Sequence, residues 1–414
     1  MDEQYILQYL NDVVAALQSS DKFKVALENL GYKCPMKWSA KQECYIPALA
    51  KNDDGMKELL EHDDSRVQAL ASARLGVKST IDETRASRLL ESDRRGALPV
   101  YLSYAAAKTL RFGGGDKTNW QNFRRGGEIR QSILAPEGHT LVIGDLSQIE
   151  YRLILWVTGQ LDKLEKLASG FDLYCEYASQ FYGEEITKED KLRRGVGKQG
   201  ILMGGYGAGK GTMIATAAGG GYGPPVFLTD EEGQRMVDLY RQGHPHVVAF
   251  WRWCDQAFGV LASGGDTEYR MANGYALLRI SGHKIHLPNG TSLDYTGLRW
   301  ATNNEVYPDQ QPDGEGYAWW QPTRKGYSRI WGSKLTADII QALACAVIKS
   351  VWVRMLQHGY RPALQVHDEL VYAVLKELAE RVKVLLKAEM ETPPAWCADI
   401  PLAAEVEVSE NYSK

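Results

Sequence analysis

Two acidic residues stand where an acid is costly, and their chemistry gives the first indication of a reaction. Asp145 ends an almost continuous apolar run at 140–144, which is typical of a buried strand. Asp368 lies between the apolar runs PALQV and LVYAV, a spacing that favours a tight hairpin with a carboxylate at its tip. A buried carboxylate is expensive unless it is paired or binds a cation, although either acid alone could simply cap a helix or complete a turn. Together they predict a clamp for Mg²⁺, which prefers carboxylate and phosphate oxygens and, as a pair of ions, stabilises both oxygens of a phosphoryl transfer.

A basic stripe between these two acids could hold the phosphates of such a substrate. Arg194, Lys198 and Tyr206 are separated by multiples of four residues, so they follow one slowly spiralling face of a helix. The predicted helix begins near Thr187, where TKED offers a capping box, and continues through KLRRGVGKQGILMGGYG. Arginine and lysine on this face could grip a triphosphate.

Glycines interrupt this helix and need an explanation. Gly195, Gly197 and Gly200 each cost roughly 1 kcal/mol relative to alanine in a helix interior. We expect packing and bound substrate to hold the helix, and a close-packed helix crossing is the alternative that would also require small residues. A solvated basic face does not explain so many glycines among the charges.

These residues must be positioned by a chain of two or three domains, as its 414 residues suggest. Residues 1 to about 98 have helical spacing, and the strand that ends at Asp145 and the helix after it lie within the next segment. A second helical stretch follows, and from about residue 275 short strands with a PNG turn precede a long helix over roughly Gly332 to Gln357. The expected segments are 1–98, 99–160, 161–274 and 275–414.

The bulk composition excludes several classes of protein. Hydrophobic residues make up 44% of the chain, and the formal net charge of -4 means that any nucleic-acid contact must come from local basic clusters. Six cysteines without CxxC pairs fit reduced thiols better than disulfides or zinc. The acidic, amphipathic start and the lack of an apolar run of about 18 residues predict a cytoplasmic chain that does not span a membrane.

Three ordered motifs resemble those of the family A DNA polymerases, the DNA polymerase I group, and particularly its bacteriophage members. The stretch DLSQIEYR, Asp145 to Arg152, resembles motif A, which is usually DYSQIELR. The stretch from Arg194 to Gly207 resembles motif B, and VHDE at 366–369 resembles motif C. The resemblance covers most of the chain from about Thr109 onward.

The resemblance implies a role for each matched residue at the reaction centre. Asp145 and Asp368 would bind two Mg²⁺ ions, for which Mn²⁺ could substitute, with the backbone carbonyl of Leu146 as a further ligand. Glu369 would be a secondary acid near the primer end. Lys198 would hold phosphate and protonate the leaving pyrophosphate.

It also implies residues that select the nucleotide and grip the DNA. Glu150 would be the sugar gate, which blocks a ribose 2′-OH and so selects deoxynucleotides. Arg152, together with Gln148, would support the geometry of the first motif. The residues implied to contact the dNTP are Gln148, Glu150, Tyr174, Arg194, Lys198, Leu202 and Tyr206. Those implied to contact primer–template DNA are Arg111, Gln121, Asn122, Arg124, Arg125, Arg130, Ser333, Lys334 and His367.

Three positions depart from the family pattern. Leu202 replaces the usual Phe or Tyr and so cannot stack as a ring on the nucleotide. Tyr174 stands where cellular members often have His, and the stretch from Gly332 to Ile340 matches the usual QGTAADII only loosely. Sensitivity to chain terminators is therefore left open.

The fold implied by the resemblance is an α+β right hand. Residues 1–98 would form a helical thumb, 99–160 and 275–414 an antiparallel-sheet palm, and 161–274 helical fingers. The implied activity is template-directed 5′ to 3′ DNA synthesis from dNTPs on primer–template DNA, with phage replication as the expected setting. No segment is left over for a 3′–5′ exonuclease, and a processivity partner is left open. The alternatives are a non-catalytic primer–template-binding protein, a reverse transcriptase-like activity, or an RNA polymerase, which Glu150 disfavours.

Overall fold

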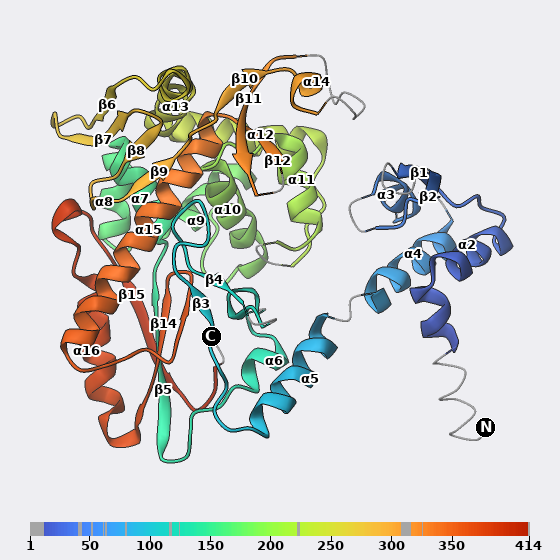
Figure 1. Ribbon diagram of the computed structural model, residues 1–414, viewed down its shortest axis with the longest axis horizontal. Helices are drawn as coiled ribbons and strands as arrows, with labels where there is room; N and C mark the ends of the chain where they lie inside the picture. The colour runs from blue at the N-terminus through green and yellow to red at the C-terminus, as the bar shows by residue number, and fades with distance from the viewer. Residues whose placement is uncertain are drawn as a thin grey trace. The chain divides into compact units, whose positions relative to one another are not determined.

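Figure 1 shows a computed structural model of the chain. The chain divides into two compact units, Met1–Pro99 and Val100–Lys414, and the boundary lies close to the one expected after residue 98. The structure describes residues 12–39, 44–50, 53–60, 62, 64–78, 81–115, 118–123, 125–221, 224–307, 316–324 and 326–412.

The N-terminal unit is built from short helices and one hairpin. Its helices are α2 (Ser20–Asn29), α3 (Asp54–Leu60), α4 (Ser65–Lys78) and α5 (Ile81–Asp93). Phe23, Leu27 and Val67 are among the side chains buried in its core, which confirms the predicted helical spacing. The antiparallel hairpin of β1 (Met36–Ser39) and β2 (Cys44–Pro47) was not predicted by the sequence pattern.

A four-stranded antiparallel sheet lies at the centre of the unit that begins at Val100. In spatial order its strands are β13 (Leu364–Val366), β14 (Glu369–Leu375), β5 (His139–Leu146) and β15 (Ala404–Ser409). The register places Glu369 on one side of Asp145 and Glu405 on the other. Strands that are far apart in the sequence therefore bring three acids into one row.

The strand and the hairpin predicted at the two acids are both confirmed. β5 contains Asp145 as its penultimate residue. Val366 pairs with Glu369, which leaves His367 and Asp368 as a two-residue turn. His367 has a φ of 52°, in the left-handed region that such tight turns require.

Two helices pack with this sheet to form the main core. A Cβ added to Gly144 in β5 would lie 2.7 Å from both Leu386 and Met390 of α16 (Ala379–Glu391), so this glycine allows a close approach of helix and strand. α15 (Gly332–Gln357) has the predicted bounds and is mostly buried in the core. It is also long and apolar enough to cross a membrane, a property that the core helix of a globular protein shares.

The segment between β5 and the later strands is helical, as predicted. Its helices are α7 (Ile149–Thr158), α8 (Leu161–Ala168), α9 (Leu173–Tyr182), α10 (Lys191–Gly204), α11 (Lys210–Ala218), α12 (Asp230–Gly243) and α13 (Pro245–Ser263). The predicted start near Thr187 is wrong. α10 begins at Lys191 because the Asp190 side chain accepts the backbone N–H of Arg193 and so supplies the N-cap.

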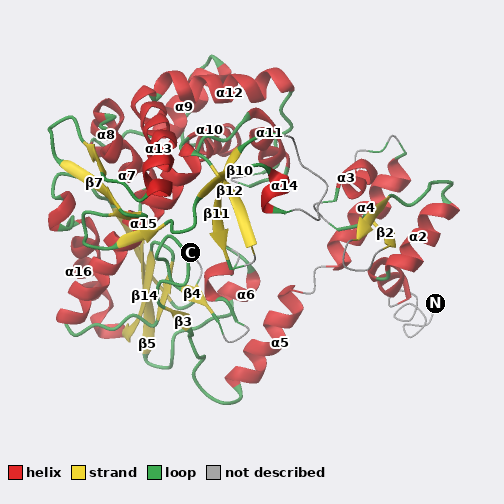
Figure 2. Ribbon diagram, turned by 45° about the horizontal axis from the view of Figure 1, so that its top comes forward, coloured by secondary structure: helices red, strands yellow, loops and turns green. Residues whose placement is uncertain are grey.

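Two smaller sheets follow the helical segment (Figure 2). The first contains β6 (Thr267–Arg270), β7 (Ala276–Ser281), β8 (Lys284–His286) and β9 (Ser292–Asp294). The PNG turn joins β8 to β9 as predicted, although strands begin at Thr267, earlier than expected. The second contains β10 (Arg299–Ala301), β11 (Ala318–Thr323) and β12 (Gly326–Ile330). The remaining short elements are β3 (Leu102–Ser103), β4 (Gly113–Gly114), η1 (Trp120–Asn122), α6 (Glu128–Gln131), α14 (Asn303–Val306), η2 (Lys376–Leu378) and η3 (Ala395–Cys397).

Candidate active site

A cavity of about 490 Å³ lies where β5 and the Asp368 turn meet the helices α7, α9 and α10. Its lining contains every residue that the motif resemblance assigned to a metal ion or to the dNTP. The lining residues are Arg125, Asp145, Leu146, Ser147, Gln148, Ile149, Glu150, Tyr151, Ile154, Tyr174, Arg194, Lys198, Ile201, Leu202, Gly205, Tyr206, Asp368 and Glu405. Residues from six separate stretches of the chain therefore converge on one space.

The two predicted metal-binding acids lie close together in this cavity. The backbone N–H of Leu146 donates to the carbonyl of Asp368 at 3.2 Å, which ties the end of β5 to the turn. Burial, and then the neighbouring charge of Asp145, raise the pKa of the Asp368 carboxyl. Two charged carboxylates this close repel each other unless a cation lies between them.

The donor set at these acids fits a hard divalent cation. The guanidinium of Arg125 donates to Asp145 at 2.9 Å and is more than half exposed, so an exchangeable positive charge already sits on this carboxylate. Among the described residues no three Asp, Glu, His or Cys side chains gather into a metal cage. Two carboxylates in a cavity of this size leave room for water and substrate oxygens, the coordination that a hard divalent cation prefers.

Helix α10 supplies a positive wall to the same cavity. Burial, and then Arg125 and Arg194, lower the pKa of the Lys198 ammonium, while the charge of Asp145 acts in the opposite direction. The Nε of Arg194 donates to one oxygen of Asp172 at 2.9 Å, and its Nη2 forms an ion pair with the same oxygen at 2.8 Å. Arg194 is therefore held by an acid that the sequence analysis did not identify.

The glycines of α10 are explained by the helices packed against it. A Cβ on Gly197 would lie 2.0 Å from the carbonyl oxygen of Tyr174, and one on Gly200 would lie 2.2 Å from the ring of Tyr177. Both tyrosines belong to α9. A close crossing of α9 and α10 thus accounts for these glycines, in agreement with the alternative interpretation of the sequence.

Glu150, the predicted sugar gate, is fixed from two sides. The guanidinium of Arg111 donates to one carboxylate oxygen, and the hydroxyl of Tyr206 donates to the other. Burial, and then Glu150, raise the pKa of the Tyr206 hydroxyl, so it remains a donor. Arg111, predicted to contact DNA, is engaged with Glu150 in this structure.

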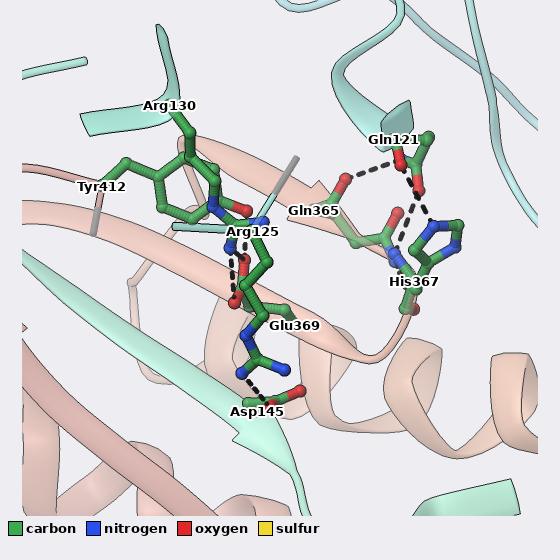
Figure 3. A network of polar contacts seen from close by, with 8 residues as sticks. All are labelled: Gln121, Arg125, Arg130, Asp145, Gln365, His367, Glu369 and Tyr412. Atoms are coloured by element: carbon green, nitrogen blue, oxygen red, sulfur yellow. Dashed lines mark hydrogen bonds and ion pairs between the residues drawn. The ribbon is translucent and has the colours of Figure 1, made fainter. Parts of the chain in front are cut away.

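A second network joins the Asp368 turn to the segment before β5 (Figure 3). The backbone N–H of His367 donates to the Gln121 side chain at 3.0 Å, and the His367 Nε2 lies 3.1 Å from the Gln121 carbonyl. The Gln121 amide in turn donates to the carbonyl of Gln365 at 2.8 Å. Asn122, next in the chain, is exposed. Gln121 and His367, both predicted to contact DNA, thus lie side by side.

Arg130 and Glu369 are placed differently from the sequence-based expectation. Arg130, predicted to contact DNA, is 5% exposed, and its guanidinium donates to both oxygens of Glu369 at 3.0 Å. Glu369, predicted as an acid near the primer end, also accepts the Tyr412 hydroxyl and does not line the cavity. A buried arginine whose guanidinium is held by Glu369 is not placed to contact a phosphate backbone, and Glu369 itself lies outside the cavity lining in this structure.

The other predicted residues lie outside the cavity. Arg152 is buried and donates to the carbonyls of Ser147 and Pro401, which ties α7 to the segments around it. Lys334 lies 3.6 Å from Asp338, and Ser333 contacts Gly207 at the end of the motif B stretch. Arg124 lies outside the described residues.

Several lining residues were not singled out from the sequence. Glu405 reaches the cavity because β15 pairs with β5 opposite Asp145, a register that no local pattern encodes. Ser147, Tyr151 and Ile201 follow from their neighbours in the motifs once the cavity is known. Asp172 had a usable signal, since an Asp before an apolar helical stretch is a typical N-cap.

Comparison with known proteins gives consistent results. Protein-family models yield no match. The DNA polymerase of Bacillus phage SP02 is 29% identical over 290 residues, which is 69% of this chain and 43% of that protein. The thermostable DNA polymerase I of Thermus thermophilus is 27% identical over 330 residues, 77% of this chain and 33% of that protein. The chain thus spans less than half the length of these curated relatives.

A solved structure has a similar fold. The POL domain of Pol1 from M. smegmatis, in complex with DNA primer-template and dNTP, has a TM-score of 0.63 and 19% sequence identity, and the match covers 99% of this chain and 66% of that one. The fold is therefore that of a DNA polymerase POL domain, with mixed helix and sheet. The sequence relatives indicate the class of protein more narrowly than the fold does. In sequence, the chain is similar to the polymerase region of DNA polymerase I and of a phage DNA polymerase, in agreement with the family that its three motifs resemble.

Proposed function

We propose that this chain carries out template-directed 5′ to 3′ DNA synthesis, adding dNTPs to a primer 3′-OH with release of pyrophosphate. The observation that supports this most directly is the single cavity in which Asp145 and Asp368 lie with Arg194 and Lys198. Paired carboxylates beside a basic wall are what nucleotidyl transfer requires, because the reacting triphosphate carries several negative charges.

Asp145, Asp368 and the carbonyl of Leu146 would hold two divalent cations, Mg²⁺ or in its place Mn²⁺. Bound there, such ions stabilise the attacking and the leaving oxygens of the phosphoryl transfer. Arg125 would leave Asp145 when this happens and could then contact the DNA backbone, since its side chain is 59% exposed. Its present position would serve to neutralise Asp145 in the absence of substrate.

The basic residues of α10 would bind the triphosphate. Arg194 and Lys198 are one helical turn apart, so their charges reach neighbouring phosphates. The lowered pKa of Lys198 also makes its ammonium a better proton donor to the leaving pyrophosphate. Tyr174 and Leu202, which line the same space, would form the walls around the nucleotide.

Selection of deoxynucleotides would depend on Glu150. Its carboxylate is fixed by Arg111 and Tyr206, so it cannot easily move away from an added 2′-OH. A rigid side chain discriminates better than a mobile one, because a clash then has to be relieved by displacing the substrate.

The parts of a right hand can be assigned on this basis. The sheet of β13, β14, β5 and β15 would be the palm, the helices from α8 to α13 the fingers, and the N-terminal unit the thumb. Gln121 and His367 would meet the primer end of a DNA duplex, a ligand that is present in the related POL domain structure. We further propose that these 414 residues have no 3′–5′ exonuclease activity, a view supported by the POL-domain match over 99% of the chain.

Primer extension on a defined DNA template tests the proposal. Asp368→Asn should lower nucleotide addition by at least about a thousandfold, because a metal site contributes several kcal/mol to the transition state. Asp230→Asn, an exposed acid outside the cavity, is the matched control and should leave extension unchanged. Extension should fail with rNTPs, and no nucleotide should be released from a mismatched primer.

Other outcomes would support the alternatives. Tight primer–template binding without extension by the unmodified chain would indicate a non-catalytic binding protein. Faster extension on an RNA template than on a DNA template would indicate a reverse transcriptase-like activity. Release of a terminal nucleotide that survives Asp368→Asn would contradict the proposed lack of exonuclease activity.

A further inference from the structure

Two carboxylates on neighbouring strands face each other in the central sheet, and each has its own arginine. Glu369 in β14 lies opposite Asp145 in β5, so their side chains share one face of the sheet. Arg130 pairs with Glu369, and Arg125 pairs with Asp145 (Figure 3). Like charges in this position would destabilise the sheet unless both were compensated.

The two arginines differ sharply in exposure. The side chain of Arg130 is 6% exposed, whereas that of Arg125 is 59% exposed. The Nη2 of Arg130 donates to both carboxylate oxygens of Glu369, and hydrogen bonds between charged groups are stronger than neutral ones. The arginine that neutralises Glu369 is therefore buried, whereas the arginine that neutralises Asp145 is exposed and exchangeable.

Tyr412, near the end of the chain, completes the buried pair. Its ring lies 3.7 Å from the Arg130 guanidinium carbon, and its hydroxyl donates to Glu369. Tyr412 is 1% exposed, and its backbone N–H donates to the carbonyl of Ile133 at 2.9 Å. Burial, and then Glu369, raise the pKa of this hydroxyl, so it remains a donor.

We propose that Tyr412 is a positioning residue for the polymerase reaction: together with Arg130 it holds the Glu369 carboxylate away from Asp145 and Asp368 and so fixes the turn that carries Asp368. This inference rests on the proposed function. Glu369 directly follows Asp368 in the chain, so an anchor on its side chain restrains the turn. Metal-binding side chains must be held to within about 0.5 Å of their productive geometry. An anchor on the next residue limits how far the Asp368 turn can shift.

A variant that removes one oxygen atom tests this role. Tyr412→Phe keeps the ring under Arg130 and deletes only the hydroxyl that Glu369 accepts. Tyr372→Phe is the matched control: Tyr372 is also 1% exposed, lies on β14 with Glu369, and has no hydrogen-bond partner for its hydroxyl among the described residues. Both variants lose a buried tyrosine oxygen, but only one loses a contact to Glu369.

Single-nucleotide addition with the full chain should separate positioning from stability. We expect Tyr412→Phe to lower kcat about tenfold with KM for dNTP within about twofold of the unmodified chain, on the scale of one hydrogen bond to a charged group. Tyr372→Phe should leave kcat unchanged. Tyr412→Phe should melt at a lower temperature than Tyr372→Phe, because only Tyr412 loses a hydrogen bond to a buried carboxylate, so kcat is measured well below both melting temperatures. Equal kcat values for Tyr412→Phe and Tyr372→Phe would overturn the inference.

A second measurement keeps this test independent of polymerase activity. Mn²⁺ binding, followed by electron paramagnetic resonance with primer–template and dNTP present, should be about threefold weaker in Tyr412→Phe than in Tyr372→Phe, a small part of one such hydrogen bond. If the unmodified chain failed to extend any primer, the proposed function would fail, and Mn²⁺ affinity would still decide the role of Tyr412. Identical Mn²⁺ affinities in the two variants would then overturn it.

Discussion

Asp172→Asn should increase the affinity of the chain for dNTP, because it releases the arginine that is expected to bind the phosphates. One oxygen of Asp172 accepts a hydrogen bond from Nε of Arg194 at 2.9 Å and forms an ion pair with its Nη2 at 2.8 Å. The other accepts the backbone N–H groups of Tyr174 and Cys175 and caps α9. Asparagine keeps a side-chain oxygen for the cap and loses the charge, so the helix start should be preserved.

The size of the effect follows from the exposure of the ion pair. The Arg194 side chain is 30% exposed and that of Asp172 is 11% exposed, so solvent screens the attraction in part. A pair of this kind contributes about 0.5 to 1 kcal/mol, and this free energy must be given up before Arg194 can turn to a triphosphate. Its removal should lower the Kd for dNTP about two- to fivefold.

Single-turnover nucleotide addition over a range of dNTP concentrations measures this Kd. Asp190→Asn is the matched control, because Asp190 also caps a helix and pairs with an arginine, Arg193, that does not line the cavity. It removes the same charge nearby without releasing Arg194. A Kd for dNTP that is unchanged or higher in Asp172→Asn than in the control would refute the reasoning, since Arg194 would then bind phosphate with the help of Asp172 or not at all.

Three further predictions concern packing, pH and sugar selection. Gly200→Ala should destabilise the fold by about 1 to 3 kcal/mol in thermal unfolding, because the added Cβ would lie 2.2 Å from the buried ring of Tyr177. Gly259→Ala, whose Cβ would have no described neighbour within 4 Å, should stabilise the fold slightly. Equal melting temperatures for the two variants would contradict the packing argument. Burial lowers the pKa of His244 to about 4, so the unfolded chain takes up a proton near pH 6.5 that the folded chain does not. The free energy of unfolding should therefore fall by up to about 3 kcal/mol from pH 6.5 to 4 in urea denaturation, and His244→Gln should reduce this slope. Tyr206→Phe removes one of the two hydrogen-bond donors that fix Glu150. In competitive incorporation it should lower the preference for dNTP over rNTP about threefold to tenfold. An unchanged preference would mean that the Tyr206 hydroxyl does not hold Glu150 in place.

The parts of the fold that could be predicted are those with a strong local signal. The apolar run before Asp145 is typical of a buried strand, and the two runs around Asp368 favour a hairpin; the structure confirms both elements. The bounds of α15 followed from a long apolar helical pattern in the same way. In each case the signal lies in neighbouring residues.

The features that were missed depend on partners far away in the chain. Arg130 resembles a surface cation in the sequence, and only Glu369, 239 residues later, makes it an interior one. Glu405 faces Asp145 because of a strand register set by residues on both sides of the helical segment. The wrong helix start at Thr187 has a local cause, since two capping signals lie three residues apart and the later one, Asp190, is used.

The order of the central sheet has a consequence for how the protein is made. β5 ends at Leu146, but its two neighbours, β14 and β15, begin only at Glu369 and Ala404. During synthesis β5 therefore leaves the ribosome long before either strand that pairs with it. Both edges of β5 remain unpaired while the helices after it fold. Contacts so distant in sequence are slow to form, and exposed strand edges are prone to aggregate. All the acids of the cavity can thus come together only after Glu405 has been synthesised, and a chain interrupted before Ala404 would contain most of the described helices but would lack the strand that carries this acid.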